Sequence, residues 1–379
     1  RGFAGLAAGV LNQADATDAA KPWRLRGRAR QWVQRLHLWL GLSVGVAYAL
    51  IALSGSALAW QKPWLRTAYP QLAGHALPDA AQRADVLARI PAQWPAQGLR
   101  AVDLPLDGLP VWQLYFADGT RRYVDPASGE LLLTRPPRGD LLGVLYDWHL
   151  HLLAGKTGEE VLGVLGWLVL CLLVSGPLLW WPGRRNLGAS LRPHAQPLTR
   201  RWLSWHRSAG VLTWPLIVLV SLTGTLMIYG AGTGRLLRAV FADPPPPPRP
   251  AAIAWRDAPI DWAAVLDAAQ RALPGAALHR VALPQERDGQ VAIRAQAPGE
   301  WHQVGRSTVW LDPWSATVRG RYDATADGLG TRINQAVYPL HSGGVGGTPW
   351  RMLVTAAGVL PAFFLVTGFL FWRARQRRR

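Results

Sequence analysis

The sequence predicts a mainly α-helical membrane protein: a four-helix transmembrane bundle, built from a tandem parallel repeat, that carries two small α+β domains. Three observations lead to this fold class. Four long runs lack any charged residue, basic tracts lie beside them, and a segment that begins with histidine occurs twice at matching spacing. Together they indicate membrane spans, their orientation and their relation by repeat.

Each charge-free run is longer than the roughly 20 residues that cross a hydrocarbon core of about 30 Å as a helix. Pro215 and Pro361 lie inside two of them, where a helix bundle tolerates proline and where kinks are expected. The runs cover residues 38–60, 161–182, 208–234 and 352–372.

The net charge of +18 follows from orientation in a membrane and does not indicate nucleic-acid binding. Six basic residues lie between Lys21 and Arg35, six between Arg184 and Arg207, and five between Arg373 and Arg379, with no acid among them. These 17 charges leave 24 basic residues against 23 acids in the rest of the chain. By the positive-inside rule, both termini and the middle loop are cytoplasmic and the two long segments lie outside.

Both outer segments show the same order of a helical pattern, a short strand and a hairpin. The helical patterns cover 79–90 and 260–273, and the short strands cover 111–116 and 291–295. The hairpins turn at Asp125-Pro126 and Asp312-Pro313, but only the first has a glycine in its turn, Gly129. The prolines of 244–250 predict a stiff extended linker.

The expected organisation follows from these segments. Its parts are the basic N-terminal segment 1–36, the first span 37–60, the first outer domain 61–140, the entry helix and second span 141–182, the cytoplasmic loop 183–201, the third span 202–234, the second outer domain 235–338 with its linker 244–250, the fourth span 339–372 and the basic tail 373–379.

Two histidines occupy equivalent positions of the repeat. His37 precedes the Ser54-Gly55 pair by the same eighteen residues that separate His206 from Thr223-Gly224. An ionisable side chain at membrane depth is costly and usually faces a bundle interior where it serves a site. We therefore expect His37 and His206 to form a pair near the cytoplasmic face.

A second pair is expected near the outer face, from His341 and either His149 or His151. His151 and His341 are each followed by glycines, which favours His151. His149 and His341 each precede a Ser/Thr-Gly pair whose glycine lies 27 residues on, which favours His149. The two alignments disagree, and we prefer His151, with His149 as the alternative.

Two pairs of imidazoles in a helix bundle suit two haem b groups, each held by two axial histidines. Such sites favour electron transfer, because no open position remains on the iron. A structural zinc site needs four ligands together, and a proton relay would recruit acids that the spans lack. Arg35 and Arg207 are candidates to pair with haem propionates, although they also suit lipid headgroups.

The chain resembles the PepSY-associated transmembrane family. The resemblance rests on His37-Leu-Trp-Leu-Gly41, on the segments that begin at His151, Ser175, Trp205 and Leu340, and on Val366-Thr367-Gly368. The two hairpins resemble the PepSY modules of that family. The resemblance covers about residue 30 to the end and implies a multi-pass protein of the bacterial inner membrane, with periplasmic PepSY-like domains.

The resemblance further implies a di-haem enzyme of iron uptake that passes electrons across the membrane to a periplasmic ferric-siderophore, so that iron is released. The sequence lacks a Gly-rich dinucleotide motif, so we expect a separate electron donor, either quinol or a cytoplasmic reductase. The alternative is a non-redox PepSY membrane protein that binds peptide or protein, or regulates a peptidase.

Overall fold

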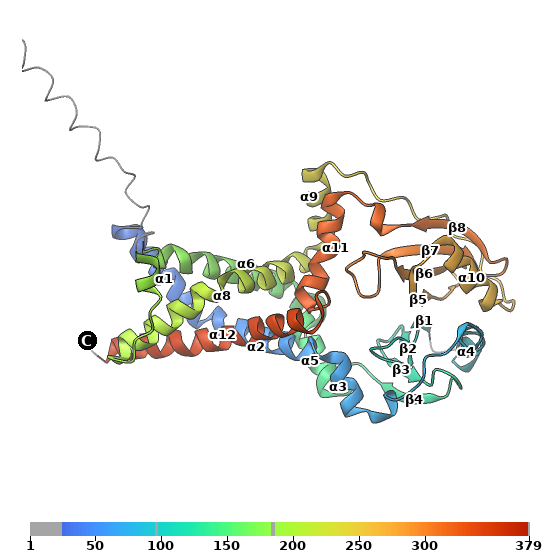
Figure 1. The fold of residues 1–379 in the computed structure, drawn as a ribbon, viewed down its shortest axis with the longest axis horizontal. Helices are drawn as coiled ribbons and strands as arrows, with labels where there is room; N and C mark the ends of the chain where they lie inside the picture. Colours follow the sequence, from blue (N-terminus) through green and yellow to red (C-terminus); the bar gives the residue numbers. More distant parts are fainter. Residues whose placement is uncertain (1–24, 95–97, 183–185, 378–379) are drawn as a thin grey trace, which may run out of the picture.

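The computed structural model describes residues 25–94, 98–182 and 186–377 as a helical bundle joined to a β-sheet domain (Figure 1). Parts of the predicted basic tracts, namely 1–24, 183–185 and 378–379, lie outside the described residues. The helices are α1 (Gly27–Leu42), α2 (Val44–Leu58), α3 (Gln61–Ala68), α4 (Ala80–Gln93), α5 (Leu141–His151), α6 (Gly155–Trp180), α7 (Leu187–Ser190), α8 (Leu198–Ile228), α9 (Gly230–Phe241), α10 (Trp262–Ala272), α11 (Leu329–Ser342) and α12 (Gly347–Gln376).

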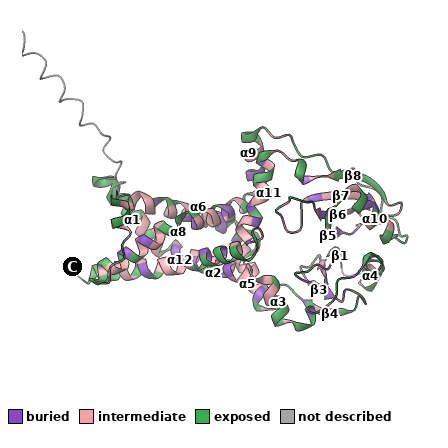
Figure 2. Ribbon diagram, viewed as in Figure 1, coloured by how far each residue is buried: buried purple, intermediate pink, exposed green. Residues whose placement is uncertain are grey.

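The helices α6, α8 and α12 are long and apolar enough to cross a membrane, and α1 with α2 is a fourth, broken span when the bent pair is taken as one. Around the bundle, α1 packs against α6, α6 against α8, α8 against α12, and α12 against α2. Large apolar side chains such as Val164, Leu212 and Met352 are exposed on the bundle surface (Figure 2). Lipid is the environment that such a surface requires, so these four spans confirm the predicted membrane protein.

The first span bends by 50° between α1 and α2, where the sequence predicted one span over 37–60. Ser43 occupies the break, and its hydroxyl donates to the carbonyl of Trp39 at 2.6 Å. Serine bonding back to the preceding turn bends helices. By contrast, α8 and α12 continue through Pro215 and Pro361.

In the part of the chain that the structure describes, eight strands form one antiparallel sheet in the order β4-β3-β2-β1-β5-β6-β7-β8. The expectation of two separate outer domains is therefore wrong in one respect: β1 pairs with β5, so the two halves share a single sheet. The strands are β1 (Leu99–Asp103), β2 (Trp112–Phe116), β3 (Arg121–Val124), β4 (Leu131–Arg135), β5 (Ala277–Ala282), β6 (Val291–Gln296), β7 (Ser307–Asp312) and β8 (Thr317–Tyr322).

One face of the sheet carries the core, which it shares with α4 and α10. Val102, Val281 and Ile293 are fully buried there, together with Val86 and Val265 of the two helices. A capping box between Asp79 and Gln82 begins α4. The other face of the sheet is turned toward the bundle (Figure 1).

The two predicted hairpins are present as β3–β4 and β7–β8. Gly129 has a φ of +72° in the first turn, and Ala316 takes the equivalent place in the second with a φ of +51°. The second hairpin therefore keeps the turn geometry without its glycine, although a left-handed conformation costs a residue with a side chain about 1–2 kcal/mol.

Two predicted boundaries differ from the structure, namely the end of the third span and the start of the fourth, since α12 begins at Gly347 and not at residue 339. Beyond Ile228 the chain begins a separate helix, α9, so the third span ends before residue 234. The linker 244–250 has no regular secondary structure and follows α9. His149 and His341 lie near the ends of α5 and α11, which precede the spans α6 and α12.

Candidate functional site

Four histidines meet in two pairs inside the bundle. The rings of His37 in α1 and His206 in α8 have centroids 6.2 Å apart. The rings of His149 in α5 and His341 in α11 have centroids 6.0 Å apart. We call these the sheet-distal pair and the sheet-proximal pair, because α5 and α11 lie at the end of the bundle next to the sheet (Figure 1).

His151 does not join the sheet-proximal pair, so the preference for it over His149 was wrong. Its Nδ1 lies 3.0 Å from the carboxylate of Asp147, one turn earlier in α5, and its side chain is 34% exposed. Residues two apart on a helix point in roughly opposite directions. Because His149 faces the bundle, His151 cannot.

Each imidazole is anchored on a neighbouring helix by a hydroxyl or a carbonyl. His37 Nδ1 lies 2.7 Å from Ser175 Oγ on α6, and His206 Nδ1 lies 3.1 Å from Thr367 Oγ1 on α12. Both hydroxyls already donate, Ser175 to Leu172 O and Thr367 to Phe363 O. With their protons on these carbonyls, the two hydroxyls accept the hydrogen bond from Nδ1–H.

The sheet-proximal pair is anchored in the same way. His149 Nδ1 lies 2.9 Å from the carbonyl of Ile51, and His341 Nδ1 lies 2.9 Å from the carbonyl of Val220. A carbonyl can only accept, so Nδ1 carries the proton in both rings. The hydroxyls of Ser54 and Thr223 lie 3.2 Å and 3.4 Å from the same Nδ1 atoms.

The carbonyls assign the Nδ1–H tautomer to His149 and His341, and the hydroxyl contacts of His37 and His206 fit the same tautomer. Nδ1–H is the donor, and in the neutral ring Nε2 keeps its lone pair. Within the described parts of the chain, no hydrogen bond involves Nε2 of any of these histidines. Metal-bound histidines are oriented in this way, with one nitrogen on the metal and the other donating to a protein acceptor.

A glycine lies under each ring. A Cβ added to Gly55 would come within 2.7 Å of His149 Cε1, and one added to Gly224 would come within 2.8 Å of His341 Cε1. At Gly176 and Gly368 the corresponding distances to His37 and His206 are 3.8 Å and 3.5 Å. Each ring thus meets a Ser/Thr-Gly pair whose hydroxyl lies near Nδ1, and in the sheet-proximal pair the glycine also leaves the room that the ring needs.

Sequence reasoning used these four dipeptides only as spacing marks and missed their contact with the rings. The signal was present, because Ser/Thr-Gly occurs once at a matching place in each of the four spans. What the sequence could not give was the pairing. Each dipeptide supports a histidine of another helix and never the histidine that precedes it in its own span.

The two predicted arginines lie near the sheet-distal end but make no hydrogen bond or ion pair with the histidines among the described residues. Arg35 is exposed, with its guanidinium 5.9 Å from the centre of the Trp32 ring. Arg207 lines a cavity of about 290 Å³ together with Arg200 and His194. A role at propionates therefore stays a prediction for both.

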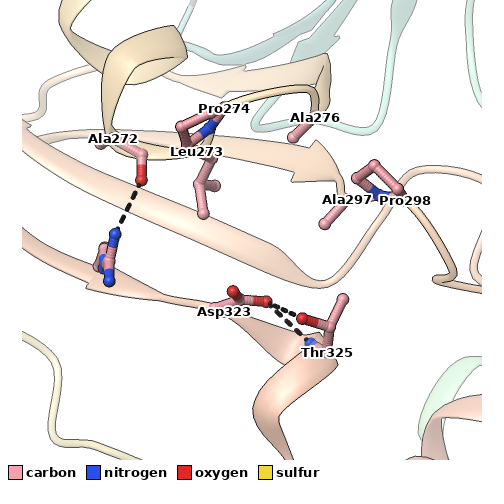
Figure 3. A pocket seen from close by; sticks show the side chains of 9 residues that line it. Ala272, Leu273, Pro274, Ala276, Ala297, Pro298, Asp323 and Thr325 are labelled. Atoms are coloured by element: carbon pink, nitrogen blue, oxygen red, sulfur yellow. Dashed lines mark hydrogen bonds between the residues drawn. The ribbon is translucent and has the colours of Figure 1, made fainter.

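Another cavity, of about 220 Å³, lies in the sheet domain, and none of the four paired histidines lines it (Figure 3). The polar groups around it already bond to one another or to the backbone. Arg321 donates to the carbonyl of Ala272, and the carboxylate of Asp323 accepts from the amide and hydroxyl of Thr325. This cavity offers little for a ligand to bind.

The family model described as the PepSY-associated TM region matches residues 34–375. The chain belongs to the PepSY-associated TM region family. No curated protein matches this chain. The match covers the bundle, the sheet domain and all four paired histidines, so the site described above lies within the family region.

The donor set of this PepSY-associated protein fits haem iron better than a bare metal ion. In the described residues no group of three or more His, Cys, Asp or Glu side chains could hold a metal. Imidazole nitrogens lie about 2 Å from a metal such as zinc, so two rings on opposite sides of one metal ion have centroids about 6 Å apart. Both pairs have that spacing, and a porphyrin supplies the ligands that a pair of histidines lacks.

Proposed function

We propose that this protein is a membrane oxidoreductase that holds two haem b groups, one at each histidine pair, and reduces a periplasmic ferric-siderophore so that its iron is released. The observation that carries the proposal is the shared tautomer: two pairs of imidazoles about 6 Å apart, each with Nδ1–H anchored and Nε2 free to coordinate. Bound haem would supply one-electron redox chemistry.

The positions of the pairs support electron transfer across a membrane. His206 and Thr223, which mark the two pairs on the continuous helix α8, are 17 residues apart. At a rise of about 1.5 Å per residue this is about 25 Å, close to the thickness of a hydrocarbon core. The donor in this proposal is separate from the chain, either quinol or a cytoplasmic reductase, and the bacterial inner membrane is the expected location.

The protein's own part is to hold the rings. The hydroxyls of Ser175 and Thr367 and the carbonyls of Ile51 and Val220 fix each ring's orientation and tautomer before any cofactor binds. Such hydrogen-bond acceptors also raise the basicity of the coordinating nitrogen.

The test is haem quantitation and a reduced-minus-oxidised spectrum of the purified protein, expressed with ample haem. The parent should hold two b-type haems per chain. His206→Ala and His341→Ala should each lose one, and so should His149→Ala, whereas the matched control His151→Ala should keep both. Absence of haem from the parent protein would refute the proposal.

The activity itself is tested with the same variants. The dithionite-reduced parent, mixed without oxygen with a ferric-siderophore, should be reoxidised while ferrous iron appears, one electron for each iron. His341→Ala should lose most of this reaction, and His151→Ala should retain it. A reduced parent that stays reduced in the presence of several ferric chelates would leave the protein without this activity.

A further inference from the structure

A row of charged side chains crosses the face of the sheet that is turned toward the bundle. Asp103 of β1 is paired in register with Arg280 of β5, and Arg280 is paired with Arg294 of β6. These residues alternate with the fully buried Val102, Val281 and Ile293, so they lie on the face opposite the core. The row therefore crosses the seam where the two halves of the sheet meet.

The acid in this row is already satisfied. The Nη2 of Arg280 donates to Asp103 Oδ2 at 2.8 Å, and the hydroxyl of Tyr115 donates to the same oxygen at 2.7 Å. Glu300, the other acid nearby, accepts from the backbone amides of Ala297 and Arg306 and from Ser307. Neither carboxylate has an oxygen free of such a bond to offer a further cation.

Two arginines of the described residues near these acids remain without an ion pair. Arg294 lies directly across from Arg280, yet in the described ranges no ion pair or hydrogen bond involves its guanidinium. Arg306 bonds through its backbone only, and its side-chain Nε is buried without a partner. Like charges placed opposite each other destabilise a sheet, and half-buried unpaired charges are costly.

The pKa shifts of Arg294 and His302 indicate an excess of positive charge on this face of the sheet. Burial lowers the pKa of Arg294, and the neighbouring Arg306 and Arg280 lower it further. Burial, followed by Arg306, Arg294, His279 and Arg280, lowers the pKa of His302 to about 3. The surroundings of Arg294 and His302 disfavour the protonated forms although Asp103 and Glu300 raise the pKa of Arg294, so an anion is the group that would relieve the remaining positive charge.

The surplus charge lies close to the sheet-proximal pair. The ring of His302 stacks on that of Tyr338 with centroids 5.2 Å apart. Tyr338 lies on α11, three residues before His341 and therefore one turn away on the same helix. An anion held on this face would be next to the end of the bundle from which electrons leave in the proposed function.

We infer that Arg294 and Arg306 bind the substrate and select ferric chelates of net negative charge, whose carboxylate or catecholate oxygens the guanidinium forks would receive. This inference rests on the proposed function and adds the charge class of its substrate. A chelate with a free ammonium group would meet repulsion at the same place.

Binding is tested with redox-inert gallium(III) chelates, by calorimetry on the full-length protein in detergent. Gallium(III) dicitrate is the anionic probe, and a gallium(III) trihydroxamate with a free amine is the cationic one. The anionic probe should bind at least about tenfold more tightly, which is the effect of one charge-assisted contact. Arg294→Gln and Arg306→Gln should each weaken it by about tenfold, and Arg294→Lys should weaken it less.

Arg319→Gln is the matched control, since Arg319 is exposed on the edge strand β8, and it should leave binding unchanged. Without a ligand, Arg294→Gln should melt no lower than the parent, because it removes a repulsion. Equal binding of both probes, or a variant that melts several degrees lower while binding normally, would overturn the inference. Binding of acidic phospholipid in nanodiscs without binding of either gallium chelate would also overturn it.

Haem content measured on the same samples separates this inference from the proposed function. Two haems per chain without binding of the anionic probe would remove the anion site and leave the oxidoreductase. Arginine-dependent binding of the probe to a chain that holds no haem would remove the oxidoreductase and leave the anion site.

Discussion

Four Ser/Thr-Gly dipeptides contact the four imidazoles, and the space between glycine and ring differs between the two pairs. Gly55 and Gly224 have a histidine ring at less than 3 Å from the position of an added Cβ, whereas Gly176 and Gly368 have 3.5 Å or more. Contacts below 3.0 Å require something to move, and packed interiors yield little. The sheet-proximal pair therefore depends on its glycines, and the sheet-distal pair does not.

Gly55→Ala and Gly224→Ala should displace His149 and His341 and cost the protein its sheet-proximal haem. Overpacking of this kind costs about 1–3 kcal/mol, or a shift of the ring from its anchor. Gly176→Ala and Gly368→Ala are matched controls and should retain two haems. Haem quantitation decides the matter, and a Gly55→Ala protein with both haems would show that the ring tolerates the methyl group.

His302 makes the stability of the sheet domain depend on pH. Its pKa is about 3 in the folded chain, because of burial first and the nearby arginines second, against 6.5 in an unfolded one. Between these values the unfolded state binds a proton that the folded state refuses, so stability falls as the pH falls below 6.5. Above 6.5 both states are neutral and the effect vanishes.

Between pH 7 and pH 5 the free energy of unfolding of the parent should therefore fall by about 2 kcal/mol more than that of His302→Gln, because of the shifted pKa of His302. Urea unfolding of the sheet domain, followed by limited proteolysis, measures it. Between pH 7 and pH 8.5 the two proteins should respond alike. Parallel pH profiles down to pH 5 would exclude His302 as the source.

At this scale the sequence predicted three of the four paired histidines and offered the fourth, His149, as the alternative to His151. Two local patterns disagreed: the glycines after the histidine favoured His151, and the distance to the Ser/Thr-Gly pair favoured His149. The second pattern was right because each of these dipeptides contacts a histidine ring. The glycines after His151 serve another purpose: a Cβ at Gly158 would strike the carbonyl of His151, so this glycine permits a close backbone approach.

At the scale of elements, the seam between β1 and β5 holds the two halves of the sheet together. Val102 is paired with Val281 across it, and both are fully buried in a core that includes α4 and α10. The helices also contact each other over the seam. The two halves therefore share one core, and we expect them to unfold together.

Val281→Ala should lower the stability of both halves by about 2 kcal/mol, the transfer and cavity cost of two buried methyl groups. Hydrogen exchange should accelerate in β1 and β2 as well as in β5 and β6. Val318→Ala, on the exposed edge strand β8, is the control and should change stability by less than about 0.5 kcal/mol. Faster exchange confined to β5–β8 would mean that the halves are independent.

The sequence predicted the hairpins, the helices α4 and α10 and the single strands before the hairpins, because each has a local period or a turn signal. It did not predict β1, β5 or their pairing. Leu99–Asp103 and Ala277–Ala282 are short, mix basic with apolar residues, and pair across more than 170 residues of chain. A long-range pairing of this kind has no signature in local sequence.

At the scale of the whole molecule, charge and shape agree on one orientation. The start of α1, the connection from α6 to α8 and the C-terminal end of α12 lie together at the end of the bundle farthest from the sheet (Figure 1). Eleven of the 17 basic residues in the three tracts lie in the described parts of these segments. Basic residues near span ends stay on the cytoplasmic side.

We therefore expect the sheet domain to face the periplasm, which cysteine labelling tests in a Cys171→Ala background, since Cys171 is the chain's single cysteine. Ala252 and Ala195 are both exposed, the first in the connection to the sheet and the second in the loop before α8. In intact spheroplasts an impermeant maleimide should label Ala252→Cys, and it should reach Ala195→Cys only after the membrane is opened. Moving 17 cationic charges outward opposes the rule that sets topology. The reverse labelling would place the anion-binding face in the cytoplasm, and reduction of a periplasmic chelate would then be excluded even if both haems were present.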